Sequence, residues 1–196
     1  MSNERHQQRQ QRLKEQVDAR IEAAKESRGI LMVFTGNGKG KSTAAFGTVT
    51  RAVGHGQKAA VIQFIKGNWD NGEKNLLQQH DVEFQVMATG FTWETQDKEA
   101  DTAAAQSVWQ HGKRMLQDES LNLVVLDELT YMVTFGYIEL AEVLEALSKR
   151  PATQTVIITG RGCHRDIIDM ADTVSEIRPV KHAFDAGIMA QQGIDW

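Results

Sequence analysis

The stretch 29–43, GILMVFTGNGKGKST, joins an apolar run to a loop rich in glycine and lysine. A buried strand followed by such a loop and a helix is typical of chains that wrap backbone N–H groups around phosphate. The usual pattern is G-x-x-x-x-G-K-[ST]. Here Gly36 stands only four positions before Gly40, and Thr35 occupies the place five before it. The loop is therefore one residue short of the general pattern, and its context must decide whether it binds a nucleotide.

That context favours a nucleotide. A G-K-[ST] tripeptide alone is common, but here it follows the predicted strand 29–35 and opens a predicted helix over 42–53. The helix N-terminus and Lys41 would offset phosphate charge, and a nearby hydroxyl can ligate Mg²⁺. The alternative is a glycine-rich turn with a solvent-exposed lysine. The predicted nucleotide contacts come from the whole loop: Gly36, Asn37, Gly38, Lys39, Gly40, Lys41, Ser42 and Thr43.

The rest of the chain predicts an α/β fold. Apolar runs alternate with segments of helical spacing, which indicates a mostly parallel sheet of about six strands with helices on both faces, P-loop NTPase-like and RecA-like. Ligands of such sheets bind at the carboxyl ends of the strands. The polar and glycine-rich sequences fall after the runs, where those ends are predicted. The predicted strands are 29–35, 58–65, 82–87, 121–126, 155–159 and 173–177.

The first 28 residues differ in composition from the remainder. Charged residues and glutamine dominate 1–28, and the apolar positions Leu13, Val17, Ile21 and Ala24 form one narrow helical stripe. We predict an N-terminal helical arm over 1–28 and a single P-loop α/β domain over 29–196. Either the arm is a solvated helix, partly disordered, or its stripe closes over a site or a neighbouring subunit, because such a helix is marginal alone.

Composition excludes several classes of function. The chain has 196 residues, 41% hydrophobic content and a net charge of -4, which suits one core and disfavours a nucleic-acid partner. Its one cysteine, Cys163, excludes an intramolecular disulfide and a cysteine-rich metal cluster. No apolar stretch approaches the roughly 20 residues that span a bilayer, and the N-terminus lacks a signal-peptide core. We therefore expect a cytoplasmic protein with no membrane partner.

Two acidic residues follow the predicted strand 121–126. Asp127 and Glu128 stand where a carboxylate could hold the Mg²⁺ of a nucleoside triphosphate, with Ser42 as a further ligand. The simpler readings are a helix cap for Asp127 and plain surface for Glu128. No Ser-His-Asp order, H-E-x-x-H or G-x-S-x-G is present, so hydrolysis by a protein nucleophile is not indicated.

Four separated segments then resemble one family. They are GNGKGKST, VVLDELTYMVTFGYI (124–138), TGRGCHRDIIDMADTVSEIRPVKHAFDAGI (159–188) and the ending AQQGIDW. Together they are similar to the P-loop class of ATP:corrinoid adenosyltransferases over about residues 29–196. The shortened loop fits that family's pattern.

The resemblance implies transfer of the 5′-deoxyadenosyl group of ATP to the Co(I) of a corrinoid such as cobalamin or cobinamide, in adenosylcobalamin biosynthesis and salvage. The cobalt is the nucleophile and triphosphate leaves, so no general base is needed and Lys41 would act catalytically on the leaving group. The resemblance also implies Mg²⁺ or Mn²⁺, a homodimer and a reduced flavoprotein as electron donor. For the corrinoid, it points to Phe91, Trp93 and Arg161, with Trp69 as a weaker candidate; both aromatic rings could instead fill the core.

Two rival classes remain on the residues alone: a P-loop ATPase or kinase performing phosphoryl transfer, and a nucleotide-dependent binding or regulatory protein. Arg51 either faces the nucleotide or is solvated. His164 and His182 have no spaced partner for a metal, so we expect satisfied histidines there.

Overall fold

The computed structural model describes residues 3–65, 70–87 and 97–196. All six strands of these residues form one sheet in the order β3-β2-β4-β5-β1-β6, and every neighbouring pair is parallel. The predicted α/β class and the six strands are confirmed. The order, which the sequence did not predict, places β1 between β5 and the edge strand β6. The bounds are β1 (Leu31–Thr35), β2 (Ala59–Gln63), β3 (Glu83–Val86), β4 (Leu123–Asp127), β5 (Thr155–Thr159) and β6 (Thr173–Glu176).

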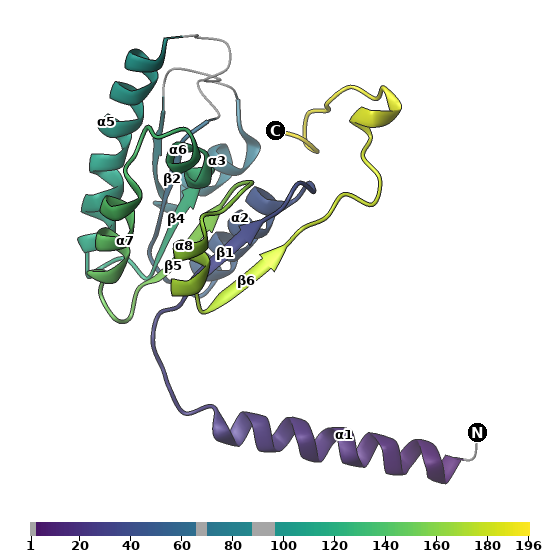
Figure 1. Cartoon of the computed structure of the whole chain (residues 1–196). Coiled ribbons are helices and arrows are strands. Elements are labelled where there is room, and N and C mark those ends of the chain that lie inside the picture. Colours follow the sequence, from purple (N-terminus) through teal and green to yellow (C-terminus); the bar gives the residue numbers. More distant parts are fainter. Residues whose placement is uncertain (1–2, 66–69, 88–96) are drawn as a thin grey trace.

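Helices cover both faces of this sheet, as predicted, because successive strand side chains point to opposite faces. One set of buried strand residues packs with α2 and α3, and the set in between packs with α5, α6, α7 and α8 (Figure 1). The helices are α1 (Asn3–Ala23), α2 (Lys41–Gly54), α3 (Gly72–Leu77), α5 (Lys98–Gln117), α6 (Leu129–Thr134), α7 (Leu140–Ser148) and α8 (Arg165–Met170), with 3₁₀ turns η1 (Gln78–His80) and η2 (Phe184–Ala186).

Helix α2 follows directly from β1 and fixes the loop between them. Its buried positions Ala45, Phe46, Val49 and Ala52 recur at helical spacing and lie on the core. They pack against alternate residues of the central strands, including Val125. The residues before α2 therefore sit at the carboxyl end of β1, the edge of the sheet where the other strand-to-helix loops also begin (Figure 1).

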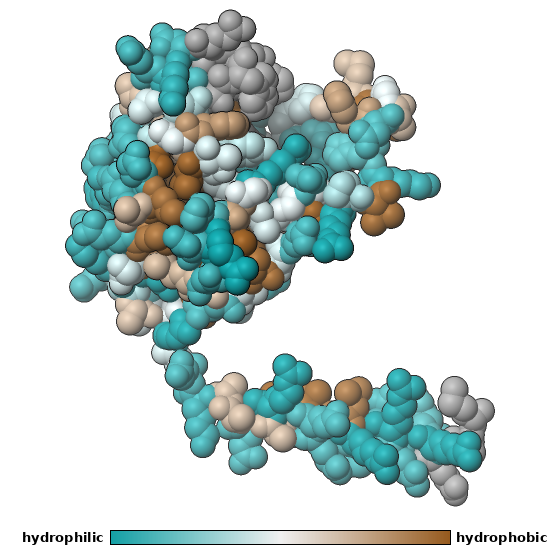
Figure 2. Space-filling view, in the orientation of Figure 1, coloured by the Kyte–Doolittle hydropathy of each residue, from teal (hydrophilic) through white to brown (hydrophobic). Residues whose placement is uncertain are grey.

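Helix α1 lies apart from the α/β core and is joined to it by the segment 24–30 (Figure 1). The stripe residues Leu13, Val17 and Ile21 are 53%, 44% and 67% exposed. Figure 2 shows this helix as a largely hydrophilic rod with a few apolar side chains. Within the single chain the N-terminal helix is thus a solvated one, and its closing over a site or a subunit stays a prediction. No helix in the described part of the chain is long and apolar enough to cross a membrane.

The C-terminal segment after β6 leaves the core and then returns toward it. It carries exposed apolar side chains at Val180, Phe184 and Met189. Its last residues come back to the β1–α2 loop, where Asp195 forms an ion pair with Lys39. Residues 35–43 and the chain terminus therefore meet at one edge of the sheet.

Candidate nucleotide site

The β1–α2 loop is fastened to the chain that leaves β6. The Gly38 N–H donates to the Ile177 carbonyl at 2.8 Å, and the Ile177 N–H donates to the Thr35 carbonyl at 2.8 Å. Gly36 has φ +96°, and a Cβ there would stand 2.4 Å from the Ile177 oxygen. Only glycine fits this position, because both the backbone conformation and the close approach exclude a side chain. The loop's shape thus depends on the end of β6 as well as on its own glycines.

Lys41 is the first residue of α2 and is only 7% exposed. Its ammonium donates to the Gly38 carbonyl at 2.9 Å, so the side chain folds back over the loop. Burial lowers the pKa of Lys41; the carboxylates of Glu128 and Asp127 act in the opposite direction, while Arg161 adds to the lowering. A triphosphate beside this ammonium would favour its charged form, which is the form that binds phosphate.

Three polar side chains stand side by side where β2, β4 and β5 end. The register pairs Gln63 with Asp127, and it pairs the residues just before Asp127 and Thr159. Thr159 donates its hydroxyl to Asp127 Oδ1 at 2.7 Å, and Gln63 Nε2 donates to Asp127 Oδ2 at 3.3 Å. Each carboxylate oxygen of Asp127 thus already accepts a hydrogen bond from the protein, and the side chain is fully buried.

Glu128 has a different environment from its neighbour Asp127. It is one of two residues other than glycine with positive φ among those described, at +63°, and its N–H donates to Thr159 Oγ1 at 2.9 Å. Its side chain lines the same cavity as Ser42. Gly160 leaves room for this arrangement, because a Cβ there would stand 2.0 Å from Thr130 Oγ1 and 3.1 Å from Glu128 Oε2. Of the two acidic candidates, Glu128 faces the cavity and Asp127 belongs to the core.

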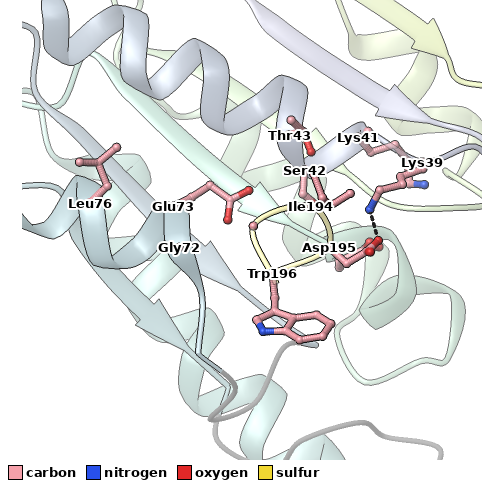
Figure 3. A pocket seen from close by; sticks show the side chains of 13 residues that line it. Lys39, Lys41, Ser42, Thr43, Gly72, Glu73, Leu76, Ile194, Asp195 and Trp196 are labelled. Carbon is pink, nitrogen blue, oxygen red and sulfur yellow. Dashed lines mark hydrogen bonds and ion pairs between the residues drawn. The ribbon is translucent and has the colours of Figure 1, made fainter. Parts of the chain in front are cut away.

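The cavity itself has a volume of about 430 Å³. Its lining comes from four parts of the chain: the loop and first turn of α2, the helix α3, the C-terminal segment, and Glu128 after β4; Figure 3 labels residues of the first three. The predicted residues Lys39, Gly40, Lys41, Ser42 and Thr43 all line it, and Glu73, Leu76, Ile194 and Trp196 were not predicted.

A second cavity of about 640 Å³ adjoins the loop and is lined by Asn37, Lys39 and much of the C-terminal segment. Lys39, Ile194 and Asp195 line both cavities, so the Lys39–Asp195 ion pair stands between them. Asn37 and Arg161 line only the second. The carboxylate of Asp195 also accepts the Gln191 N–H at 2.8 Å, and both interactions hold its pKa below the ordinary value. The carboxylate of Asp195 therefore neutralises Lys39, one of the two lysines of the loop.

Of the remaining candidate site residues, some lie within the part of the chain that the structure describes and others lie outside it. Phe91, Trp93 and Trp69 lie outside the described residues. Arg51 is exposed and lines a hollow near the other end of α2, away from the loop. The histidines are satisfied, as expected: Nδ1 of His164 accepts the Asp166 N–H and Nδ1 of His182 accepts the Phe184 N–H, each at 3.2 Å. The thiol of Cys163 is half-buried, and burial raises its pKa to about 11.

Several residues at this site were not predicted. Gln63 is the only polar residue within the otherwise apolar strand β2, a pattern the sequence does show. Asn71 stands at the start of a short helix, where an N-cap could be guessed. Nothing local marks Asp195 and Trp196, because their proximity to the loop comes from the return of the C-terminal segment.

A six-stranded parallel sheet with a glycine-rich loop, a lysine and an acidic strand end at its carboxyl edge is the architecture of a P-loop α/β protein. Comparison with known protein families identifies a particular family within this class. Residues 27–196 match the family ATP:corrinoid adenosyltransferase BtuR/CobO/CobP, and residues 1–21 match Cob(I)alamin adenosyltransferase N terminal. The chain belongs to the ATP:corrinoid adenosyltransferase family and is a transferase.

Curated relatives agree over the full length. The chain is 71% identical to the Corrinoid adenosyltransferase of Escherichia coli (strain K12) over 196 residues, covering 100% of both chains. It is also 71% identical to the Corrinoid adenosyltransferase CobA of Salmonella typhimurium, again over 100% of both. A Corrinoid adenosyltransferase of Pseudomonas aeruginosa is 48% identical, covering 99% of this chain and 97% of the relative. The match at residues 1–21 brings the N-terminal helix into the family as well.

Proposed function

We propose that the chain binds ATP in the β1–α2 loop and transfers its 5′-deoxyadenosyl group to the Co(I) of a corrinoid. The observation that carries this is the single cavity shared by Lys41, Ser42 and Glu128 in a member of this family. A cobalt–carbon bond forms as the bond between C5′ and its oxygen breaks, and the electron pair leaves with the triphosphate. The product belongs to adenosylcobalamin biosynthesis or salvage.

The protein's task in this reaction is positioning and charge. Co(I) supplies the nucleophilic electron pair, so no side chain has to remove a proton. The loop amides and the Lys41 ammonium would instead stabilise the charge that develops on the departing triphosphate. Lys41 is already held by the Gly38 carbonyl, which reduces the reorganisation that nucleotide binding requires. A loop one residue short would seat the nucleotide with C5′ toward the corrinoid rather than with its γ-phosphate presented for transfer.

We propose Mg²⁺ or Mn²⁺ as the metal that accompanies ATP. The donor chemistry fits, because a serine hydroxyl and a carboxylate, Ser42 and Glu128, face one cavity, and hard oxygen ligands suit both ions. When bound, the metal would neutralise charge on the triphosphate. Asp127 would hold the end of β4 rather than contact the ion, since both of its oxygens accept protein hydrogen bonds.

For the corrinoid we propose Phe91, Trp93 and Arg161. Arg161 lines the cavity next to the loop, which supports a contact with phosphate or amide groups of the substrates. Phe91 and Trp93 could pack on the macrocycle or displace its lower axial ligand, so that Co(II) is easier to reduce. Turnover of Phe91→Ala and Trp93→Ala with Co(II) and with pre-reduced Co(I) tests this: equal losses with both substrates would exclude the axial-ligand role.

We also propose a homodimer and a reduced flavoprotein as electron donor. The apolar stripe Leu13, Val17 and Ile21 is exposed in the single chain. This supports a partner surface for α1, because an apolar stripe stabilises a helix only when another surface packs on it. The donor follows from the substrate, because Co(I) requires a strong reductant. Deletion of residues 1–25 should weaken corrinoid binding and turnover; unchanged values would leave α1 as a solvated arm.

The product of the nucleotide separates this function from its rivals. Wild-type protein is supplied with MgATP and chemically reduced corrinoid, and the phosphate products are separated. Triphosphate formed together with adenosylated corrinoid is the expected result. ADP would indicate phosphoryl transfer, and ATP recovered intact would indicate a binding or regulatory role; either result contradicts the proposal.

A further inference from the structure

The buried polar row at the carboxyl edge of the sheet extends beyond the acidic strand end. Gln63, Asp127 and Thr159 are 1%, 0% and 0% exposed. Two residues earlier on each strand, the same face carries Val61, Val125 and Ile157. Among the buried residues of this face, polarity is therefore confined to the last position of the three neighbouring strands. Burying polar groups there costs free energy unless each one is hydrogen-bonded, so their partners are informative.

Both oxygens of Asp127 accept hydrogen bonds from its neighbours on the adjacent strands, and this sets the direction of the bonds in the row. A carboxylate only accepts, so both neighbours must donate to it. Thr159 accepts the Glu128 N–H, which leaves its own proton for Asp127. Gln63 likewise turns its Nε2 to Asp127, which leaves Oε1 facing the other way. That oxygen accepts from Asn71 Nδ2 at 3.4 Å.

Asn71 extends this series of hydrogen bonds to helix α3, which forms one wall of the nucleotide cavity. It is 3% exposed, and because its amide nitrogen is turned to Gln63, its Oδ1 is left to accept the Lys74 N–H at 3.1 Å. That bond caps the first turn of α3. Helix α3 lines the cavity through Gly72, Glu73 and Leu76. Figure 3 shows these residues around the same space as the loop residues.

We infer that Gln63 and Asn71 are positioning residues for adenosyl transfer: their hydrogen-bonded chain from Asp127 to the N-cap of α3 holds the α3 wall of the cavity in place relative to the end of β4. The inference rests on the proposed function, because the cavity must be the one that binds MgATP. Neither side chain lines that cavity, so neither is a catalytic residue.

A purely structural role predicts something different. If these positions only filled space, an apolar side chain of the same volume would serve, as valine and isoleucine do two residues earlier. If the chain positions α3, an apolar replacement leaves the fold standing but weakens ATP binding. The two roles are therefore separable by comparing nucleotide affinity with thermal stability.

The test uses full-length protein, with Kd for MgATP from titration calorimetry and KM and kcat from turnover. Gln63→Met keeps the volume and removes both bonds of the amide. Asn71→Ser retains a capping oxygen for α3 and removes the donor to Gln63. We expect each to raise Kd and KM for ATP about tenfold, with kcat changed less and KM for the corrinoid unchanged. Gln63→Glu should not rescue, because a carboxylate cannot donate to Asp127.

A double variant tests whether the two residues act as a unit. Gln63→Met with Asn71→Ser should raise Kd for MgATP no further than either change alone. Each single change already interrupts the same series of hydrogen bonds, so their effects are not additive. The matched control is Asn75→Ala, which removes an exposed bond of the same helix, from Asn75 Nδ2 to Asp70 at 2.7 Å, and should leave Kd unchanged.

Two outcomes would overturn this inference and leave the proposed function standing. Wild-type Kd and KM for ATP in both single variants, whatever their melting temperatures, would show a structural role, and multiplied effects in the double variant would show two independent residues. Wild-type protein that fails to bind MgATP would overturn the proposed function and this inference with it. A second measurement covers a variant that folds poorly: hydrogen exchange in 72–77 should slow when MgATP binds to wild type, and not in Asn71→Ser.

Discussion

The hydroxyl of Thr159 donates a 2.7 Å hydrogen bond to Asp127 Oδ1, and both side chains are fully buried at the ends of adjacent strands. The other oxygen, Oδ2, accepts from Gln63. A carboxylate held in this way sets the position of the residue that follows it, Glu128, which reaches the cavity. The acidic pair of the sequence is thus divided between a residue of the core and a residue of the site.

Asp127→Asn and Glu128→Gln should therefore affect different properties, the first the stability of the fold and the second the binding of MgATP. The first replaces an acceptor by a donor in a fully bonded buried site and should lower the free energy of unfolding by about 1–3 kcal/mol. The second should leave stability nearly unchanged and weaken MgATP binding about tenfold, because a neutral amide is a poorer ligand for the metal. Urea unfolding and calorimetry of both variants check this. A stable Asp127→Asn protein with wild-type ATP binding, or unimpaired MgATP binding by Glu128→Gln, would contradict it.

Lys41→Ala removes the buried ammonium that stands over the loop. We expect a loss of roughly 10² or more in kcat/KM for ATP, because one preorganised donor to the developing charge on the leaving group is gone. The Kd for the corrinoid should not change. Steady-state kinetics with pre-reduced Co(I) avoid any effect on the reduction step. A loss below threefold would mean that the loop amides carry the triphosphate without Lys41.

Asp195→Asn removes the carboxylate that pairs with Lys39 between the two cavities. A triphosphate bound to the loop would meet that negative charge, so its removal should tighten ATP binding about twofold to fivefold, more at low salt than at high salt. The matched control is Asp169→Asn, because that carboxylate also pairs with a cation but lines neither cavity. Calorimetric Kd values at two salt concentrations measure the effect, and weaker binding by Asp195→Asn would mean that the carboxylate helps to hold the nucleotide.

Acid should remove a different interaction, between Asp172 and the start of β1. The carboxylate accepts from the Arg28 guanidinium and from the Leu31 N–H at 2.8 Å, and these bonds lower the pKa of Asp172 from 3.8 to about 2. Since the folded pKa is depressed, the stabilisation is present above pH 3.8 and is lost as pH falls through about 2. Urea midpoints of wild type and Asp172→Asn should differ near neutral pH, draw together as the pH falls below 3.8 and converge near pH 2.

The control for this pH dependence is Asp169→Asn, whose ion pair with Arg165 lies on the exposed surface. Its urea midpoint should stay close to that of wild type at each pH, because exposed pairs contribute little. A difference between wild type and Asp172→Asn that persists unchanged down to pH 2 (about the folded pKa of Asp172) would contradict the assignment.

Much of this site could be predicted from the sequence because its strand, loop and helix are formed by residues that are neighbours along the chain. Apolar runs, turn residues and the G-K-S tripeptide lie next to one another along the chain, so the strand, loop and helix that place Lys41 were predictable. The register was not, because it depends on which strands pair. Only the pairing of β2 with β4 makes Gln63 a partner of Asp127, and only the return of the C-terminal segment brings Asp195 to Lys39. The division of roles between Asp127 and Glu128 needed side-chain contacts.

The claim that the short loop holds the triphosphate as a leaving group is tested most directly by a crystal structure of the protein with MgATP. The account predicts the triphosphate along the loop from Gly36 to Ser42, with Lys41 beside it and C5′ directed to the open cleft where a corrinoid could approach. A γ-phosphate directed to the cleft, with the ribose buried behind it, would contradict the account and indicate phosphoryl transfer instead.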